Sequence, residues 1–149
     1  MDVILIHKYE QTCTNLFNSP RSNRLIASSQ KIAVLVVEDE FLIRMDIADS
    51  LERAGFIVHE AGNARDAIDI LGDNPDIQAM FTDIDMPGGM DGVTLAAFAR
   101  DRWPPLKIII TSGYRRVAAN EMPAECRFFD KPYNLNSVIT TIREMTVTR

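Results

Sequence analysis

The sequence has few cysteines, no long apolar run and no excess of basic residues, and each absence excludes a class of protein. Only two cysteines occur among the 149 residues, Cys13 and Cys126, far apart and outside any metal-ligand spacing. We therefore expect two free thiols in a reducing compartment. No apolar run approaches the length needed to cross a bilayer. The short apolar run at residues 3–6 follows Asp2 instead of the basic segment of a signal peptide, so we expect a cytoplasmic protein with no membrane partner.

The charge balance argues against a nucleic-acid-binding surface. The chain has 21 acidic and 16 basic residues, which gives a formal net charge of −5. A protein that relies on contacts with a phosphate backbone normally has a basic excess, and we expect no direct binding to nucleic acid. With 46% hydrophobic and 25% charged residues, the composition is that of a globular protein long enough for one domain with a sizeable core.

The first thirty residues differ in pattern from the rest of the chain. Residues 1–30 have few apolar positions at any regular period, and they contain the polar stretches SPRSN at 19–23 and SSQ at 28–30. This pattern predicts a poorly ordered N-terminal extension. Residues 31–147 instead alternate between apolar strands and amphipathic helices, which indicates a single folded domain.

Alternating strands and helices follow one another from Lys31 onward. Apolar, β-branched runs predict strands at residues 32–37, 56–60, 77–82, 106–110 and 127–129. Apolar residues at helical spacing predict helices at residues 41–54, 64–71, 92–102 and 134–145, the second begun by a capping box of Asn63 and Asp66. Only a short helix is expected within residues 112–125. Repeated β-α units of this length predict a doubly wound α/β domain, with a five-stranded parallel sheet in the order 2-1-3-4-5 and helices on both faces.

Polar side chains stand where four of these apolar strands end. Glu38 and Asp39 follow the first strand, Asp83 ends the third, Thr111 ends the fourth and Lys131 follows the fifth. Ligands of an open parallel sheet bind at the carboxyl ends of the strands, near the point where the strand order reverses. We therefore expect these five side chains to converge at one edge of the sheet.

The residue types at this edge indicate metal-dependent phosphoryl transfer. Three carboxylates held close together repel one another and need a compensating cation. Mg²⁺ binds through a few carboxylates together with water and phosphate oxygens. Asp83 can then act as a nucleophile toward a phosphoryl group. Mg²⁺ and the Lys131 ammonium would neutralise charge on that group, and Thr111 would offer it a hydroxyl.

Five short motifs resemble the receiver domain of bacterial response regulators. They are VLVVEDE at 34–40, TDIDMP at 82–87, MDG at 90–92, TSG at 111–113 and DKPY at 130–133. The resemblance covers roughly residues 31–145. It implies a flavodoxin-like fold and a single-domain response regulator of a two-component phosphorelay.

The resemblance also implies the metal site and the modified residue. Asp83 would be the phosphorylation site and carry a 4-aspartylphosphate. Asp39 would be a direct Mg²⁺ ligand, and Glu38 would act through a metal-bound water. The backbone carbonyl of Asp85 would complete the protein ligands.

The same resemblance implies how the signal enters and leaves the domain. Lys131 would contact the phosphate, next to a cis Lys131–Pro132 bond, and Thr111 and Phe128 would move together on phosphorylation. A sensor histidine kinase or a histidine phosphotransfer protein would donate the phosphoryl group. The domain would catalyse only its own phosphoryl transfer and dephosphorylation. About four residues follow the last helix, so output is expected through a protein partner on the face formed by the fourth helix, the fifth strand and the last helix.

Two departures from the family pattern leave an alternative open. The loop at residues 87–92 has one residue more than the commonest spacing, and an extra glycine loosens it without removing a ligand. This loop and the weak helix within residues 112–125 motivate a second hypothesis, a receiver-like binding module that works without phosphorylation. The intact acids, Thr111 and Lys131 count against it. A flavodoxin-like electron carrier is excluded, because acids follow the first strand where a flavin phosphate requires a glycine- and hydroxyl-rich loop.

Overall fold

A computed structural model of the protein describes residues 30–114, 118 and 120–147. Backbone contacts divide the chain into two units between Gln30 and Lys31. All helices and strands described below lie in the unit that begins at Lys31. The extension predicted for residues 1–30, with Cys13 in it, falls outside the described residues except for Gln30.

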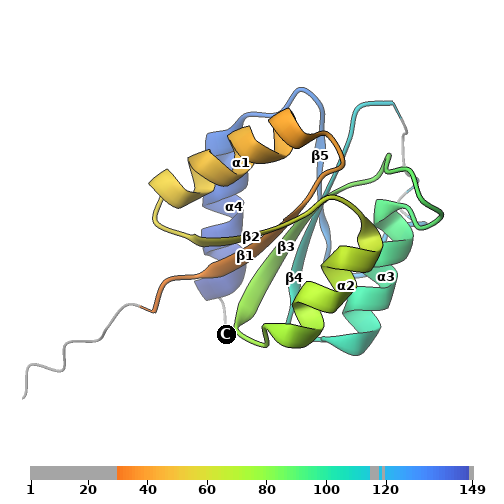
Figure 1. Cartoon of the computed structure of the whole chain (residues 1–149), viewed down its shortest axis with the longest axis horizontal. Coiled ribbons are helices and arrows are strands. Elements are labelled where there is room, and N and C mark those ends of the chain that lie inside the picture. Colours follow the sequence, from red (N-terminus) through yellow and green to blue (C-terminus); the bar gives the residue numbers. More distant parts are fainter. Residues whose placement is uncertain (1–29, 115–117, 119, 148–149) are drawn as a thin grey trace, which may run out of the picture. The chain divides into compact units, whose positions relative to one another are not determined.

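Five described strands form one parallel sheet in the order β2-β1-β3-β4-β5 (Figure 1). They are β1 (Ala33–Val37), β2 (Ile57–Ala61), β3 (Ile77–Asp83), β4 (Lys107–Ser112) and β5 (Arg127–Asp130). Every residue of β1 is buried. Both faces of the sheet are therefore covered at its centre, which explains the unbroken apolar run in the sequence. The predicted fold class and strand order are confirmed.

Helices cover the sheet on both sides. The described helices are α1 (Phe41–Arg53), α2 (Ala64–Asp73), α3 (Gly92–Arg102) and α4 (Leu135–Val147). Figure 1 shows α1 and α4 on one face of the sheet and α2 and α3 on the other. One buried cluster joins Leu35 and Leu95 between the sheet and α2 and α3. A second joins Phe81, Leu51 and Ile142 between the sheet and α1 and α4.

The start of α2 confirms Asn63 as the N-cap and one half of the predicted capping box. Asn63 Oδ1 accepts a hydrogen bond of 2.9 Å from the backbone N–H of Asp66. The second bond differs from that of a capping box, because Asp66 Oδ2 accepts at 2.8 Å from the side-chain Nδ2 of Asn63 and a capping box uses the backbone N–H of the N-cap residue. The cap therefore satisfies one N–H of the first helical turn and places a carboxylate at the positive end of the helix dipole.

The segment between β4 and β5 contains no helix among its described residues, 113, 114, 118 and 120–126. The short helix expected near residues 117–119 lies mostly outside the residues that the structure describes. Glu125 has a φ of 65°, so the chain turns sharply just before β5. In the described part of the chain, none of the helices is both long enough and apolar enough to span a bilayer.

Candidate functional site

The predicted polar side chains meet at the carboxyl ends of the central strands. Asp83 is the last residue of β3, and Thr111 lies opposite it on β4. Glu38 and Asp39 follow β1 directly, and Lys131 follows β5. Because β1 and β4 both pair with β3, the parallel sheet carries these residues to the same edge, as expected.

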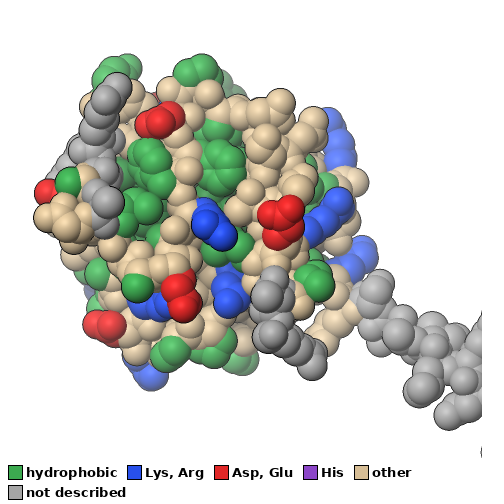
Figure 2. All heavy atoms as spheres, turned by 180° about the vertical axis from the view of Figure 1, so that it is seen from behind, with side chains coloured by type: hydrophobic (Ala, Val, Ile, Leu, Met, Phe, Trp, Pro, Cys, Tyr) green, Lys and Arg blue, Asp and Glu red, His purple; other side chains and the backbone are tan. Residues whose placement is uncertain are grey.

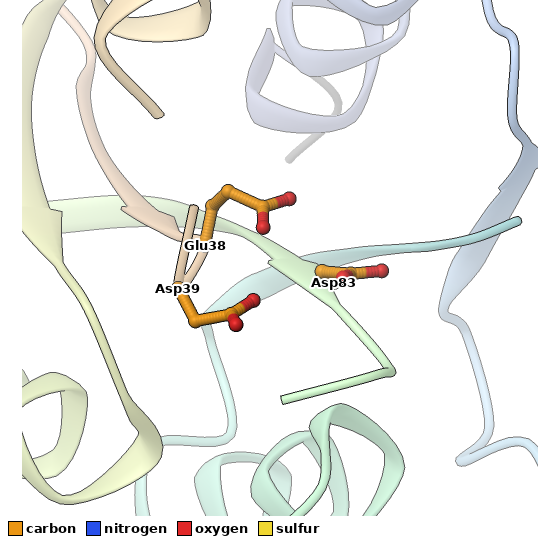
Figure 3. A group of neighbouring side chains, drawn as sticks. All are labelled: Glu38, Asp39 and Asp83. Carbon is orange, nitrogen blue, oxygen red and sulfur yellow. The ribbon is translucent and has the colours of Figure 1, made fainter. Parts of the chain in front are cut away.

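Three carboxylates converge at this edge. Glu38, Asp39 and Asp83 each offer one oxygen, and these oxygens lie within 4.8 Å of one another. Figure 3 shows the carboxylates of Glu38 and Asp39 extending toward the side on which Asp83 lies. Glu38 and Asp83 are only 1% and 4% exposed, so most of this negative charge is removed from water. Such a group needs a nearby cation.

Lys131 supplies one positive charge to the carboxylates. Its Nζ lies 3.3 Å from Glu38 Oε2 and 3.3 Å from Asp83 Oδ2. The backbone N–H of Lys131 donates to the carbonyl of Ser112 at 2.9 Å, which fixes the residue beside the end of β4. The Lys131–Pro132 peptide bond is cis, as predicted. A single ammonium facing three carboxylates leaves the site with excess negative charge.

Burial and the neighbouring charges shift the pKa values of three groups of the site. Burial raises the pKa of Asp83 above its usual 3.8, and Lys131 offsets only part of this rise. Burial also raises the pKa of Glu38 above its usual 4.5, against the opposing effect of the Glu40 N–H. Burial by itself would lower the pKa of Lys131, but the carboxylates of Asp83 and Glu38 raise it above 10.5. All three groups hold protons more tightly than in water, and a divalent cation beside the two acids would lower their pKa values by stabilising the carboxylate form.

Two buried oxygens at the site have no hydrogen-bond partner among the described residues. They are Asp83 Oδ1 and Thr111 Oγ1. Buried polar atoms are nearly always hydrogen-bonded in folded proteins. These two groups lie on neighbouring strands and suit an external ligand. The carboxylate oxygen can bind a cation, and the hydroxyl can donate a hydrogen bond to an acceptor oxygen. The donor set fits Mg²⁺ together with a phosphoryl group.

Asp85 and the loop after β3 are arranged differently from the carboxylate group. Asp85 is exposed, and its Oδ2 accepts a hydrogen bond of 3.2 Å from Ser112 Oγ. Its side chain is outside the group of three carboxylates, so a role as ligand would fall to its backbone carbonyl. In the lengthened loop, Gly88 and Gly89 have φ values of 106° and 94°. Both conformations favour glycine, so the extra residue is accommodated without strain.

Phe128 lies on β5 next to the site but not directly opposite Thr111. In the β4–β5 register, Phe128 pairs with Ile110, and Thr111 pairs with Phe129. Phe128 is half-buried against the cluster under α2 and α3. The joint movement of Thr111 and Phe128 stays a prediction.

The sequence did not identify Arg44 as a residue that contacts the site, and it did not predict the hydrogen bond from Ser112 to Asp85. Arg44 Nη1 donates to the backbone carbonyl of Glu38 at 2.6 Å. The sequence feature that could have indicated Arg44 is a single arginine within the apolar start of a helix, five residues after Asp39. That signal gives no partner, because the acceptor is a main-chain oxygen.

A family model places this site among known proteins. The model of the response regulator receiver domain matches residues 34–143, which is most of the chain. The chain belongs to the response regulator receiver domain family. Its receiver domain thus comes from a family of two-component signalling, as the motifs implied.

Curated relatives of this receiver domain include a kinase and a regulator from Brucella abortus (strain 2308). The chain is 36% identical over 121 residues to the sensor kinase CckA, a match that covers 78% of this chain and 13% of CckA. It is 32% identical over 117 residues to the response regulator receiver protein CpdR, covering 76% of this chain and 96% of CpdR. The chain therefore spans a small part of one relative and nearly all of the other.

A solved structure has the same fold. The response regulator receiver protein from Sinorhizobium medicae WSM419 superposes with a TM-score of 0.73 and 25% sequence identity. The superposition covers 80% of this chain and 98% of that protein. The flavodoxin-like arrangement expected for the receiver domain is confirmed.

Proposed function

We propose that this receiver domain accepts a phosphoryl group on Asp83 and that the modified domain signals by binding another protein. The arrangement of Asp83 carries the proposal. Its Oδ2 lies 3.3 Å from Lys131 Nζ, while its buried Oδ1 has no partner among the described residues. One carboxylate oxygen is thus anchored, and the other is available for a bond to phosphorus or to a cation.

Glu38, Asp39 and Asp83 would hold Mg²⁺, with the backbone carbonyl of Asp85 as a further ligand. Their convergence within 4.8 Å and the raised pKa values of the buried acids support this ligand set. When bound, the ion would neutralise negative charge on the phosphoryl oxygens.

The side chains of the domain account for the transfer itself. An oxygen of Asp83 attacks phosphorus, so that a P–O bond forms while the P–N bond of a donor phosphohistidine breaks. The imidazole nitrogen leaves with the bonding electrons and takes up a proton. The Lys131 ammonium and the Thr111 hydroxyl then bind phosphoryl oxygens. Water later hydrolyses the 4-aspartylphosphate, so the domain catalyses only its own modification and its reversal.

A sensor histidine kinase or a histidine phosphotransfer protein would be the donor. An apolar surface at the start of α1, directly after the acid pair, supports a protein donor over a small molecule. Phe41, Leu42 and Met45 are 61%, 71% and 42% exposed on this surface. Contiguous exposed apolar side chains mark protein contact surfaces.

The output would leave through the face formed by the short helix predicted within residues 112–125, by β5 and by the last helix, α4. The short helix lies mostly outside the described residues, so β5 and α4 are the described part of this face. This face is turned toward the viewer in Figure 2, where apolar side chains gather in one area among charged side chains of both signs. Met122, Cys126 and Phe128 are half-buried around β5. Phosphoryl contacts made by Thr111 and Lys131 would shift the balance between two arrangements of this surface.

Intact-mass measurement after incubation with acetyl phosphate and Mg²⁺ tests the modification. We expect the wild-type protein to gain one phosphoryl group in the presence of Mg²⁺ and none when a chelator is present. The Asp83→Asn variant should gain none. An Asp73→Asn variant, changed at an exposed acid of α2, should be modified normally. The proposal would be contradicted if the wild-type protein gained no phosphoryl group, or if the Asp83→Asn variant gained one.

Binding to a partner tests the output. We expect beryllofluoride with Mg²⁺, which mimics the phosphorylated state, to change the affinity of the domain for its downstream protein. An affinity that does not respond would instead favour the binding module that works without phosphorylation.

A further inference from the structure

We propose that Arg44 is a positioning residue that fixes the Glu38–Asp39 acid pair for binding of the divalent cation, an inference that rests on the proposed function. Arg44 lies in α1, and its side chain is only 16% exposed. Its Nη1 donates a hydrogen bond of 2.6 Å to the backbone carbonyl of Glu38. This carbonyl belongs to the peptide group that joins the two acids.

The peptide segment around Glu38 is held on both sides. The backbone N–H of Glu38 donates to the carbonyl of Ala61 on β2 at 3.1 Å. The backbone carbonyl of Glu38 accepts a hydrogen bond from Arg44 Nη1. A peptide group is planar, so fixing the carbonyl direction also restricts the direction in which Asp39 projects. Hydrogen bonds from a charged donor are shorter and stronger than neutral ones. Arg44 therefore acts on the direction of both carboxylates without contacting the cation.

Arg44 is itself anchored on several sides. Its Nε lies 3.3 Å from Glu60 Oε2, and its guanidinium carbon lies 5.5 Å from the centre of the Phe41 ring. A Cβ placed on Gly62 would come within 3.3 Å of Arg44 Nη1, so the glycine leaves room for the guanidinium. The N-cap residue of α1, Glu40, makes no side-chain capping bond. Arg44 thus links the start of α1 to the ends of β1 and β2.

Charge and position predict opposite effects of removing Arg44. A positive charge near three carboxylates repels an incoming cation, so its loss alone would tighten Mg²⁺ binding. Loss of the bond to the Glu38 carbonyl would release the acid pair and weaken Mg²⁺ binding. The direction of the change in affinity therefore separates a positioning role from a simple electrostatic one.

Calorimetric titration of metal-free protein with Mg²⁺ tests the inference. We expect Arg44→Met, which keeps an apolar stem, to bind Mg²⁺ about tenfold more weakly, the size seen when outer partners of metal ligands are removed. Arg44→Lys, which keeps the charge and a donor, should recover part of the affinity. Arg53→Met removes the same charge from a side chain of α1 that is 80% exposed. This control variant should bind Mg²⁺ with the affinity of the wild-type protein.

Urea unfolding in the presence of a chelator shows whether each variant is folded. If Arg44→Met does not fold, Gly62→Ala decides, because its methyl group displaces the guanidinium without removing it and should weaken Mg²⁺ binding to a smaller extent. Unchanged or tighter binding by folded Arg44→Met, or by Gly62→Ala in its place, would overturn the inference alone. Absence of Mg²⁺ binding by the unmodified protein would overturn the proposed function and the inference with it.

Discussion

The two buried acids of the proposed cation site are unfavourable for the fold without the cation. Asp83 and Glu38 are buried, and burial raises the pKa of both above the usual 3.8 and 4.5. A carboxyl whose pKa is higher in the folded protein binds more protons when folded than when unfolded. Its contribution to stability is present below the usual pKa and is lost as the pH rises through the higher folded value. At neutral pH the ionised acids therefore destabilise the fold.

An Asp83→Asn variant should be more stable than the unmodified protein at pH 7 in the presence of a chelator. We expect a gain of about 1 kcal/mol, a typical size for a single substitution at a buried polar site. The loss of stability on raising the pH from about 4 toward neutrality should also become smaller. Urea unfolding at several pH values measures both effects. The matched Asp73→Asn variant should show neither, and a less stable Asp83→Asn protein at pH 7 would contradict this account.

At the scale of elements, the contact between the start of α3 and the end of β3 fixes the backbone of the site. Gly92 is the first residue of α3, and its N–H donates to the carbonyl of Ile84 at 3.0 Å. A Cβ on Gly92 would lie 2.0 Å from the carbonyl oxygen of Asp83. The helix can approach the strand this closely only because residue 92 has no side chain.

A Gly92→Ala substitution should destabilise the domain by about 3 kcal/mol, because either α3 or the backbone of Asp83 must move. Gly72→Ala is the matched control. Gly72 lies within α2 with nothing within 4 Å of an added Cβ, so alanine there should stabilise the helix by about 0.5–1 kcal/mol. Urea unfolding midpoints measure both changes. Equal effects of the two substitutions would show that the close contact at Gly92 is not restrictive.

At the scale of the whole molecule, the proposed binding of a cation would be linked to folding. Two of the three carboxylates follow β1 and the third ends β3, so only the folded sheet brings them together. A ligand that binds the folded state alone stabilises it by RT ln(1 + L/Kd), where L is the free ligand concentration, so the stabilisation rises with the logarithm of ligand concentration above Kd.

Mg²⁺ at ten times its dissociation constant should stabilise the protein by about 1.4 kcal/mol. Thermal unfolding with and without Mg²⁺, at equal ionic strength, measures the effect, and a chelator should reverse it. Asp39→Asn should show a much smaller shift because it removes one of the three carboxylates. A shift of the same size in Asp39→Asn would place the stabilising cation elsewhere.

The sequence by itself determined the arrangement of strands and the residues at their ends. An apolar run such as β1, buried on both faces, is a local property of the chain, and repeated β-α units permit few sheet orders. Once the order was predicted, the positions of Asp83, Thr111 and Lys131 followed from where each apolar run stops. Their convergence was therefore predictable before any distance was known.

Only the tertiary structure decided the contacts that involve particular atoms. This class contains the bond from Arg44 to the Glu38 carbonyl and the bond from Ser112 to Asp85. It also contains the Thr111 hydroxyl, which has no partner in the described part of the chain. Main-chain acceptors leave no trace in the pattern of side chains, and the direction of a hydroxyl depends on neighbours distant in sequence. The pattern of residue types thus specified which groups meet. The packing of α1 against the sheet and the position of the end of β4 within the sheet specified the hydrogen bonds that hold those groups.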